Sequence, residues 1–231
     1  MRDIFQDMQV LQEGMAKLGL QLDGSQELQF ASYIREVYLF NNTYRLVGAE
    51  GREFIVKHLL DSLSAVSYFR ELLASSPSHV RMCDVGSGAG LPGIPLAIML
   101  RDMPMSLIER SGRRAGFLRN ALALCNLDGR LEVIERDLSE VDARFGVVTF
   151  RAFHPLTDSI RPVGAILAEG GSVCAYKGRT DSIEEELAAV ETLVAEGKGG
   201  SVLGWRHTIV PLEVPFLEAS RNLCVLQKIA R

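Results

Sequence analysis

Apolar side chains recur at helical spacing through the first 75 residues of the chain. Ile4, Met8, Leu11, Met15 and Leu18 lie three or four positions apart, which predicts a first helix. A less regular second series predicts another, and it consists of Leu28, Ala31, Ile34, Val37 and Leu39. A third helix is expected from Glu53 to Leu73, where Ser75-Ser76-Pro77-Ser78 ends it. We therefore expect a helical region over residues 1–76.

From Val80 onward the pattern changes to short apolar runs that alternate with helical stretches. This alternation predicts an α/β fold over residues 77–231, with a doubly wound sheet of seven strands. The strands are expected near Val80–Asp84, Met105–Glu109, Leu131–Glu135, Val147–Phe150, Ser172–Tyr176, Ser201–Val210 and Asn222–Lys228. The helices are expected near Ile94–Leu100, Arg113–Cys125, Leu156–Ala168 and Ile183–Glu196. Pro211 and Pro215 leave no helix between the last two strands, which should therefore pair as an antiparallel hairpin.

Composition places the chain among ordinary globular proteins. It has 231 residues, of which 47% are hydrophobic and 23% charged, and no apolar run approaches the roughly 20 residues of a membrane helix. Its first residues lack the apolar stretch of a secretion signal. We expect a cytoplasmic protein, and nothing in the sequence demands more than a monomer.

The positions of the cysteines and of the charged residues limit which metal sites and charged surfaces the protein can have. Cys83, Cys125, Cys174 and Cys224 lie far apart and form no C-x-x-C pair, so we expect buried thiols and no metal site. The net charge of -4 argues against a surface that is positive throughout. Four arginines nevertheless fall within one short segment, at positions 110, 113, 114 and 119, which leaves room for a local basic patch.

A glycine-rich loop follows the first predicted strand. Gly86, Gly88, Gly90 and Gly93 lie between that strand and the helix begun by Ile94, so the backbone can turn sharply and approach a ligand closely. Three of these glycines spell G-x-G-x-x-G, a string that fits nicotinamide dinucleotides, flavins, adenosylmethionine and purely structural turns. The loop alone therefore does not identify its ligand.

Acidic residues beside the loop discriminate between these ligands. Asp84 ends the first strand, where an anionic pyrophosphate at about 4 Å would cost on the order of 1 to 4 kcal/mol, whereas the ammonium and sulfonium of adenosylmethionine would be favoured. Glu109, at the end of the second strand, is placed to accept hydrogen bonds from ribose hydroxyls of either cofactor. Asp137 follows the third strand, where an adenine ring commonly lies, although an exposed turn aspartate explains it almost as well.

Six segments in the same order resemble the bacterial guanine-N7 methyltransferases of small-subunit ribosomal RNA, the glucose-inhibited division protein B family. They are His58-Leu59-Leu60-Asp61-Ser62-Leu63, Asp84 to Pro95, Arg113-Arg114-Ala115-Gly116-Phe117-Leu118, Arg151-Ala152-Phe153, Tyr176-Lys177-Gly178 and Arg221-Asn222-Leu223. The resemblance covers nearly the whole chain. It implies a Rossmann-like class I methyltransferase that uses S-adenosylmethionine to methylate N7 of one guanine in the decoding-region loop of 16S ribosomal RNA.

The resemblance also implies roles for individual residues. Gly86 and Leu91 would contact the cofactor, Asp137 and Leu138 would lie beside its adenine, and Arg151 would stand at the mouth of the active site. Two stretches depart from the family pattern. Arg136-Asp137-Leu138 replaces the usual Arg-x-Glu, and Arg45-Leu46-Val47 replaces the usual Asn-Leu-Thr, although Asn41 matches the asparagine that commonly precedes it.

Methylation at guanine N7 needs no general base, because that nitrogen already holds an unshared electron pair. We therefore expect positioning residues, namely Arg151 and Lys177 at the carboxyl ends of strands, with His58 closing the site from the helical region. Arg113, Arg114 and Arg119 would extend a phosphate track, although arginines at the start of a helix are usually only solvated. The alternatives are a methyltransferase of another substrate, a nicotinamide-dependent oxidoreductase and a cofactor-binding scaffold without activity.

Overall fold

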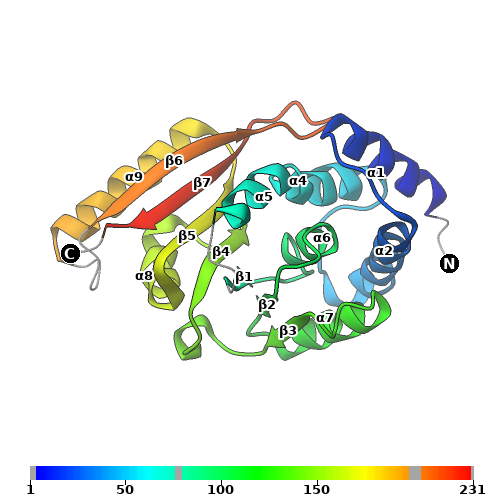
Figure 1. The fold of residues 1–231 in the computed structure, drawn as a ribbon, viewed down its shortest axis with the longest axis horizontal. Coiled ribbons are helices and arrows are strands. Elements are labelled where there is room, and N and C mark those ends of the chain that lie inside the picture. The colour runs from blue at the N-terminus through cyan, green and yellow to red at the C-terminus, as the bar shows by residue number, and fades with distance from the viewer. Residues whose placement is uncertain (1–3, 76–79, 198–203, 230–231) are drawn as a thin grey trace.

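A seven-stranded sheet forms the centre of the molecule in a computed structural model that describes residues 4–75, 80–197 and 204–229 (Figure 1). Its strand order is β3-β2-β1-β4-β5-β7-β6. The strands are β1 Met82–Val85, β2 Met105–Ile108, β3 Leu131–Ile134, β4 Phe145–Arg151, β5 Leu167–Lys177, β6 Trp205–Leu212 and β7 Arg221–Lys228. The doubly wound sheet predicted from the sequence is thereby confirmed.

Strand direction changes only at the end of the chain. β1 to β5 run parallel, whereas β7 lies between β5 and β6 and is antiparallel to both. The predicted hairpin is therefore correct, and Pro211 lies in the edge strand β6, where proline is tolerated in a sheet. The predicted start of this strand at Ser201 lies outside the described residues.

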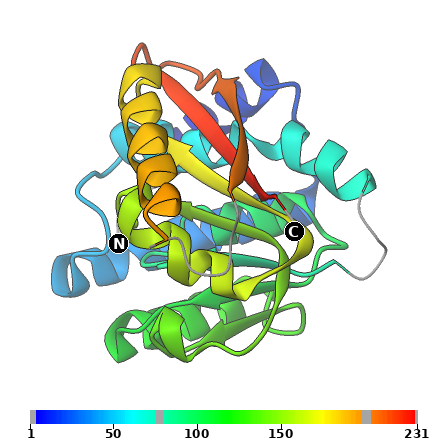
Figure 2. The same cartoon turned by 90° about the vertical axis from the view of Figure 1, so that its left-hand side faces the viewer.

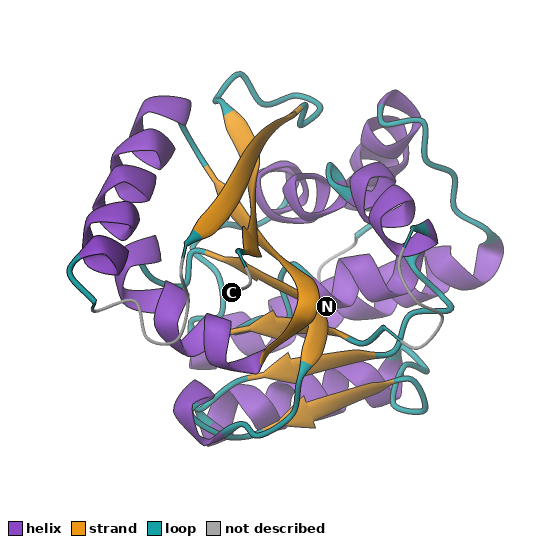
Figure 3. Ribbon diagram, turned by 60° about the vertical axis from the view of Figure 1, so that its left-hand side comes forward, coloured by secondary structure: helices purple, strands orange, loops and turns teal. Residues whose placement is uncertain are grey.

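Helices cover both faces of the sheet (Figures 2 and 3). They are α1 Phe5–Lys17, α2 Gly24–Tyr44, α3 Arg52–Phe54, α4 Asp61–Leu63, α5 Val66–Ala74, α6 Gly93–Met99, α7 Gly112–Leu124, α8 Leu156–Ile166 and α9 Thr180–Ala195, with the π-helix η1 Ile55–Leu60 and the 3-10 helix η2 Leu138–Glu140. Neighbouring strand residues face opposite sides, as Met82 and Cys83 do in β1, so the sheet divides two hydrophobic cores. Helices α8 and α9 enclose one core, and α6 and α7 pack on the other.

The N-terminal helices pack directly against α6 and α7. Asp23 and Gln26 form a capping box that begins α2, and the Gln26 amide also donates to the carbonyl oxygen of Ile98 in α6 at 2.9 Å. All seven residues of α6 are buried, because this helix lies between the sheet and the N-terminal helices. The helical region and the sheet thus share one core, while Pro77 and Ser78 of the expected boundary lie outside the described residues.

The second predicted helix exists, but its apolar series was partly wrong. Leu28 and Leu39 are 70% and 67% exposed, whereas Phe30, Tyr33, Ile34 and Val37 carry the buried face. At 3.6 residues per turn, Leu28 lies about 200° from Phe30 and Leu39 about 200° from Val37, so both leucines fall on the side opposite the buried face.

The third predicted helix is broken into segments. Residues 52–63 pass from α3 through the π-helix η1 to α4, and α5 starts again at Val66. The hydroxyls of Ser62 and Ser64 donate to the carbonyl oxygens of His58 and Asp61, each at 2.7 Å. Because such hydroxyls compete for the main-chain carbonyls, they favour a break that apolar spacing does not reveal.

Other boundaries differ little from the predicted ones. β5 begins at Leu167 rather than Ser172, with an irregular register against β4 between Phe145 and Val147. All four cysteines are buried and free, as expected. Within the described ranges, no helix combines the length and the apolar character needed to cross a membrane.

Candidate active site

The glycine loop after β1 adopts backbone conformations that favour glycine. Gly86, Gly88 and Gly90 have positive φ angles of 67°, 56° and 88°, which residues with a side chain rarely adopt. A Cβ on Gly90 would also lie 2.5 Å from Cδ1 of Ile94, so the loop needs glycine there for packing as well. The Tyr33 hydroxyl, from α2, donates to the Ala89 carbonyl oxygen at 2.8 Å and fixes the loop from above.

A cavity of about 360 Å³, called here the smaller cavity, opens beside this loop at the ends of β1 and β2. It is lined by Val85, Gly86, Ile108, Glu109, Arg110, Arg114, Arg136, Asp137, Leu138, Ala152, Phe153, His154, Asp158 and Pro162. The Glu109 carboxylate is buried and accepts hydrogen bonds from the main-chain N–H of Gly88 at 3.0 Å and of Ser111 at 2.8 Å. Each oxygen keeps a further acceptor site, so the carboxylate is oriented for a ligand hydroxyl.

Asp137 and Leu138 stand at the far side of the smaller cavity. Asp137 caps η2, because its carboxylate accepts from the Ser139 N–H at 3.1 Å and hydroxyl at 2.7 Å, and these bonds lower its pKa. The same carboxylate lies 3.6 Å from Arg110. Asp137 is therefore a turn residue that also lines the smaller cavity.

Asp84 takes a different place from the one expected at the ligand. Its side chain is fully buried beneath the loop, where Oδ2 accepts the N–H of Gly93 at 3.0 Å, and burial raises the carboxyl pKa to about 7. Oδ1 is one of two buried side-chain atoms in the described ranges without a hydrogen-bond partner. The carboxylate thus supports the start of α6 and does not line the smaller cavity.

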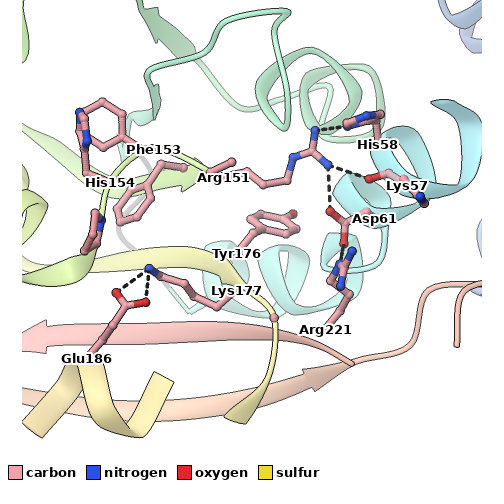
Figure 4. A pocket seen from close by; sticks show the side chains of 14 residues that line it. Lys57, His58, Asp61, Arg151, Phe153, His154, Tyr176, Lys177, Glu186 and Arg221 are labelled. Atoms are coloured by element: carbon pink, nitrogen blue, oxygen red, sulfur yellow. Dashed lines mark hydrogen bonds and ion pairs between the residues drawn. The ribbon is translucent and has the colours of Figure 1, made fainter. Parts of the chain in front are cut away.

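A second cavity, of about 630 Å³, lies where the ends of β4, β5 and β7 meet η1 and is called the larger cavity (Figure 4). It is lined by Lys57, His58, Asp61, Phe150, Arg151, Ala152, Phe153, His154, Pro155, Tyr176, Lys177, Gly178, Glu186 and Arg221. Both cavities therefore lie at the carboxyl edge of the parallel strands, the edge at which doubly wound sheets bind ligands.

Arg151 joins the sheet to the helical region inside the larger cavity (Figure 4). One guanidinium nitrogen donates to the Lys57 carbonyl and to Asp61 Oδ2, each at 2.9 Å, and the other lies 2.7 Å from Nδ1 of His58. Asp61 is also 3.2 Å from Nε of Arg221, in an ion pair without hydrogen-bond geometry. The strands β4 and β7 therefore meet at a single buried carboxylate at the start of α4.

His58 is held in its neutral form by this environment. Burial lowers the pKa of its imidazole to about 4, and the Arg151 guanidinium contributes in the same direction. A neutral ring whose Nδ1 accepts from Arg151 carries its proton on Nε2. His58 consequently offers a hydrogen-bond donor at neutral pH without a positive charge.

Lys177 is held on the opposite side of the larger cavity. Its ammonium contacts both carboxylate oxygens of Glu186, at 3.0 and 2.7 Å, and Glu186 also accepts the N–H of Leu156 at 2.6 Å. The adjoining Tyr176 donates its hydroxyl hydrogen to the Ser62 carbonyl oxygen at 2.7 Å. The end of β5, the start of α8 and the middle of α9 are thereby joined around the cavity.

The arginines predicted as a phosphate track are only partly gathered. Arg114 lines the smaller cavity, Arg113 lies 5.9 Å from the ring centre of Tyr44, and Arg119 pairs with Glu135 at 2.7 Å. All three are exposed on α7. Asn41 lies outside both cavities. Its side-chain oxygen accepts the Val47 N–H at 2.9 Å and so stabilises Arg45-Leu46-Val47, the stretch after α2 that departs from the family pattern.

Most of the predicted site residues line one of the two adjoining cavities. Gly86, Glu109, Asp137 and Leu138 line the smaller one, and Arg151, Lys177 and His58 the larger, whereas Gly88, Gly90 and Leu91 shape the loop itself. Sequence reasoning did not single out Glu186, because nothing separates it from its acidic neighbours Glu184 and Glu185. Among the described residues, no three metal-ligating side chains gather into a group.

Several solved structures share this fold. A putative O-methyltransferase from Klebsiella pneumoniae superposes with a TM-score of 0.59 at 14% identity, over 99% of this chain and 100% of that one. Magnesium protoporphyrin IX methyltransferase from Synechocystis, solved with bound adenosylmethionine, gives 0.55 at 16% identity over 90% and 98%. At such low identity the likeness establishes the fold alone.

Sequence relatives are more specific. The ribosomal RNA small subunit methyltransferase G of Ralstonia nicotianae is 35% identical over 223 residues, which cover 94% of this chain and 93% of that protein. Its namesake in Treponema denticola is 32% identical over 251 residues, covering 95% and 94%. The model of the family described as rRNA small subunit methyltransferase G matches residues 26–207. With the fold and two cavities already in place, these matches mean that the chain belongs to the rRNA small subunit methyltransferase G family.

Proposed function

We propose that this protein transfers a methyl group from S-adenosylmethionine to N7 of one guanine in 16S ribosomal RNA. The observation that carries the proposal is the pair of cavities that meet at residues 152–154. One offers an oriented carboxylate beside a glycine loop, and the other gathers cationic side chains with a neutral histidine. A donor and an anionic acceptor could thus be held side by side, and the relatives' names state the same type of reaction.

The smaller cavity fits the nucleoside part of adenosylmethionine. Glu109 presents acceptor oxygens for ribose hydroxyls, Gly86 allows close approach, and Leu138 with Asp137 lines the side where the adenine would lie. Asp84 contributes indirectly, because its Oδ2 accepts the Gly93 N–H beneath the loop and so holds the loop in shape. When bound, this cofactor supplies an electrophilic methyl group on a sulfonium centre.

Positioning is the contribution of the protein to the reaction. The N7 electron pair forms the new N–CH₃ bond while the S–CH₃ bond breaks, and the electrons of the broken bond remain on sulfur. No proton therefore has to be moved. Arg151 uses three of its five N–H groups on Lys57, Asp61 and His58, which leaves two for guanine O6 or a phosphate. Lys177 adds a point charge, and Nε2–H of His58 a neutral donor.

The RNA partner accounts for the local distribution of charge. Arg113, Arg114 and Arg119 extend from the smaller cavity along one exposed helix, where they would contact phosphates in competition with their present partners. The small ribosomal subunit is the form in which we propose the RNA is met. A monomer acting in the cytoplasm satisfies every feature of this proposal.

Methylation of purified 30S subunits that lack the modification tests the proposal. The wild-type protein with adenosylmethionine should yield 7-methylguanosine in nuclease digests analysed by mass spectrometry. Arg151→Ala should lower the rate at least 100-fold while circular dichroism at 25 °C remains native, because the variant loses the donor that orients the base. The exposed Arg179→Ala serves as the control and should leave the rate unchanged.

Cofactor binding separates this proposal from its alternatives. Isothermal titration should detect adenosylhomocysteine and not NAD. Binding of NAD alone would overturn the methyltransferase assignment, and binding of adenosylhomocysteine without 7-methylguanosine in the RNA would point to another substrate.

A further inference from the structure

A short segment after β4 forms the common wall of the two cavities. Ala152, Phe153 and His154 line the larger cavity as well as the smaller one. Ala152 has a φ of 50°, a left-handed conformation that costs a residue with a side chain about 1 kcal/mol or more. The backbone thereby turns so that the next side chain stands between the two cavities.

The side chain that stands there is the ring of Phe153 (Figure 4). It lies against the glycine loop, since a Cβ on Gly86 would be 2.5 Å from Cδ2 of Phe153. Phe150 and His154 flank the ring, with centroids 5.9 and 4.5 Å away. The ring is half-buried, so part of it faces open space rather than the core.

Of the described phenylalanine and tyrosine rings that line the larger cavity, Phe150 and Tyr176 are buried, whereas Phe153 keeps an exposed part. The ion pairs of Arg151 and Lys177 in the same lining suit the edges and phosphates of a nucleotide. A nucleobase also has two apolar faces, and proteins that hold single unpaired bases stack them on aromatic rings. Tyr176 is not available in this way, because it is buried and its hydroxyl is bonded to Ser62.

We propose that Phe153 is the stacking platform of the target base and sets the angle at which the base meets the methyl donor. The inference rests on the proposed function. A base on this ring lies at the wall that both cavities share, so its edge would face the smaller cavity, in which the donor is proposed to bind. As the base becomes cationic, the electron-rich face of the ring also favours the product charge.

The competing explanation is that Phe153 only fills space over Gly86. That role requires apolar volume, which leucine supplies, whereas stacking requires a flat ring, which tyrosine supplies. The series Phe153→Tyr, Phe153→Leu and Phe153→Ala therefore separates the two explanations. Phe5→Leu, at a phenylalanine 64% exposed on α1 and outside both cavities, is the matched control.

Three measurements are made on each variant: kcat and KM for 30S subunits lacking the modification, subunit affinity by filter binding with adenosylhomocysteine present, and the Kd of adenosylhomocysteine by titration. Phe153→Tyr should stay within threefold of the wild type in all three. Phe153→Leu should lose about 10- to 100-fold in kcat/KM and several-fold in subunit affinity, with the adenosylhomocysteine Kd within about threefold. Phe153→Ala should lose at least as much, and Phe5→Leu nothing.

Equal kcat/KM for the leucine and tyrosine variants would overturn the stacking role, because a merely space-filling ring gives that result. A loss of adenosylhomocysteine affinity as large as the loss in kcat/KM would also overturn it, since the ring would then serve the cofactor. Absence of methylation by the wild-type protein would instead refute the proposed function, so the two failures are distinguishable.

Discussion

Removing the Asp61 carboxylate should destabilise the whole protein, because this group is buried between two arginines. Its side chain is 4% exposed and that of Arg151 14%, and Arg221 approaches its second oxygen at 3.2 Å. Breaking a buried pair by removing one partner typically costs about 3–5 kcal/mol, since the remaining charge is left without compensation. We expect about 3 kcal/mol for Asp61→Ala, because Arg151 keeps its bonds to Lys57 and His58.

The matched control is another ion pair on the same helical stretch. Glu53 and Lys57 also pair, but their side chains are 50–53% exposed, so water and salt screen them. Glu53→Ala should therefore leave the unfolding free energy almost unchanged. Urea unfolding followed by circular dichroism measures both values, and for a chain of this size 3 kcal/mol corresponds to a fall in Tm of about 6–12 °C.

A double-mutant cycle identifies the cause of the loss. Arg151→Met removes the buried cation, so in that background Asp61→Ala should cost about 1–2 kcal/mol less than in the wild type. A cost below 1 kcal/mol for Asp61→Ala, or strict additivity in the cycle, would refute the argument that Arg151 and Asp61 depend on each other.

Two further predictions concern the pH dependence of stability and the glycine loop. The pKa of His58 is about 4 in the folded protein and near 6.5 when unfolded, so between these values only the unfolded chain takes up the proton, and the contribution of His58 to the unfolding free energy falls as pH falls from about 6.5 to 4. Asp84, whose pKa is raised to about 7, contributes in the opposite direction, so the effect of His58 is measured as the difference between variant and wild type. The slope of the urea-unfolding free energy against pH should be lower in His58→Gln than in the wild type by less than about 1.4 kcal/mol per pH unit, because the cavity partly solvates the ring, and an unchanged slope would contradict this prediction. Gly90→Ala combines a φ of +88° with a Cβ contact of 2.5 Å to Ile94, so it should lower the unfolding free energy by about 2–4 kcal/mol. Gly19→Ala has a φ of +69° but open space around its Cβ, so it should lower the unfolding free energy by only about 1 kcal/mol. Equal losses of the two variants in thermal melting would show that packing at Gly90 is unimportant.

The sheet could be predicted from the sequence because its signals are local. Apolar runs bounded by glycine, proline and charge marked each strand to within a few residues, and two prolines marked the hairpin. The helical region was harder, since the hydroxyls of Ser62 and Ser64 redirect main-chain bonds without changing the apolar spacing. Leu28 shows the opposite limit: an apolar residue at helical spacing that is nevertheless exposed.

The site residues show the same difference between what local sequence signals predict and what they do not. Gly86 and Glu109 could be placed because a strand end fixes where a neighbouring side chain lies. Partners far apart in sequence could not be read in this way: Arg151 with Asp61 and Lys177 with Glu186 depend on how separate elements pack. The expected role of Asp84 depended on the direction in which its side chain points. In the structure this side chain lies under the loop, where it accepts the Gly93 N–H.

The position of Asp61 in the chain has a consequence for how the protein is made. Its carboxylate belongs to the part that leaves the ribosome first, whereas Arg151 follows 90 residues later and Arg221 later still. At a synthesis rate of about 5–20 residues per second, the wait for Arg151 is on the order of 5–18 s. We therefore expect this face of the nascent helices to stay unburied until β4 has emerged, so that final docking of the N-terminal part waits for the carboxyl edge of the sheet.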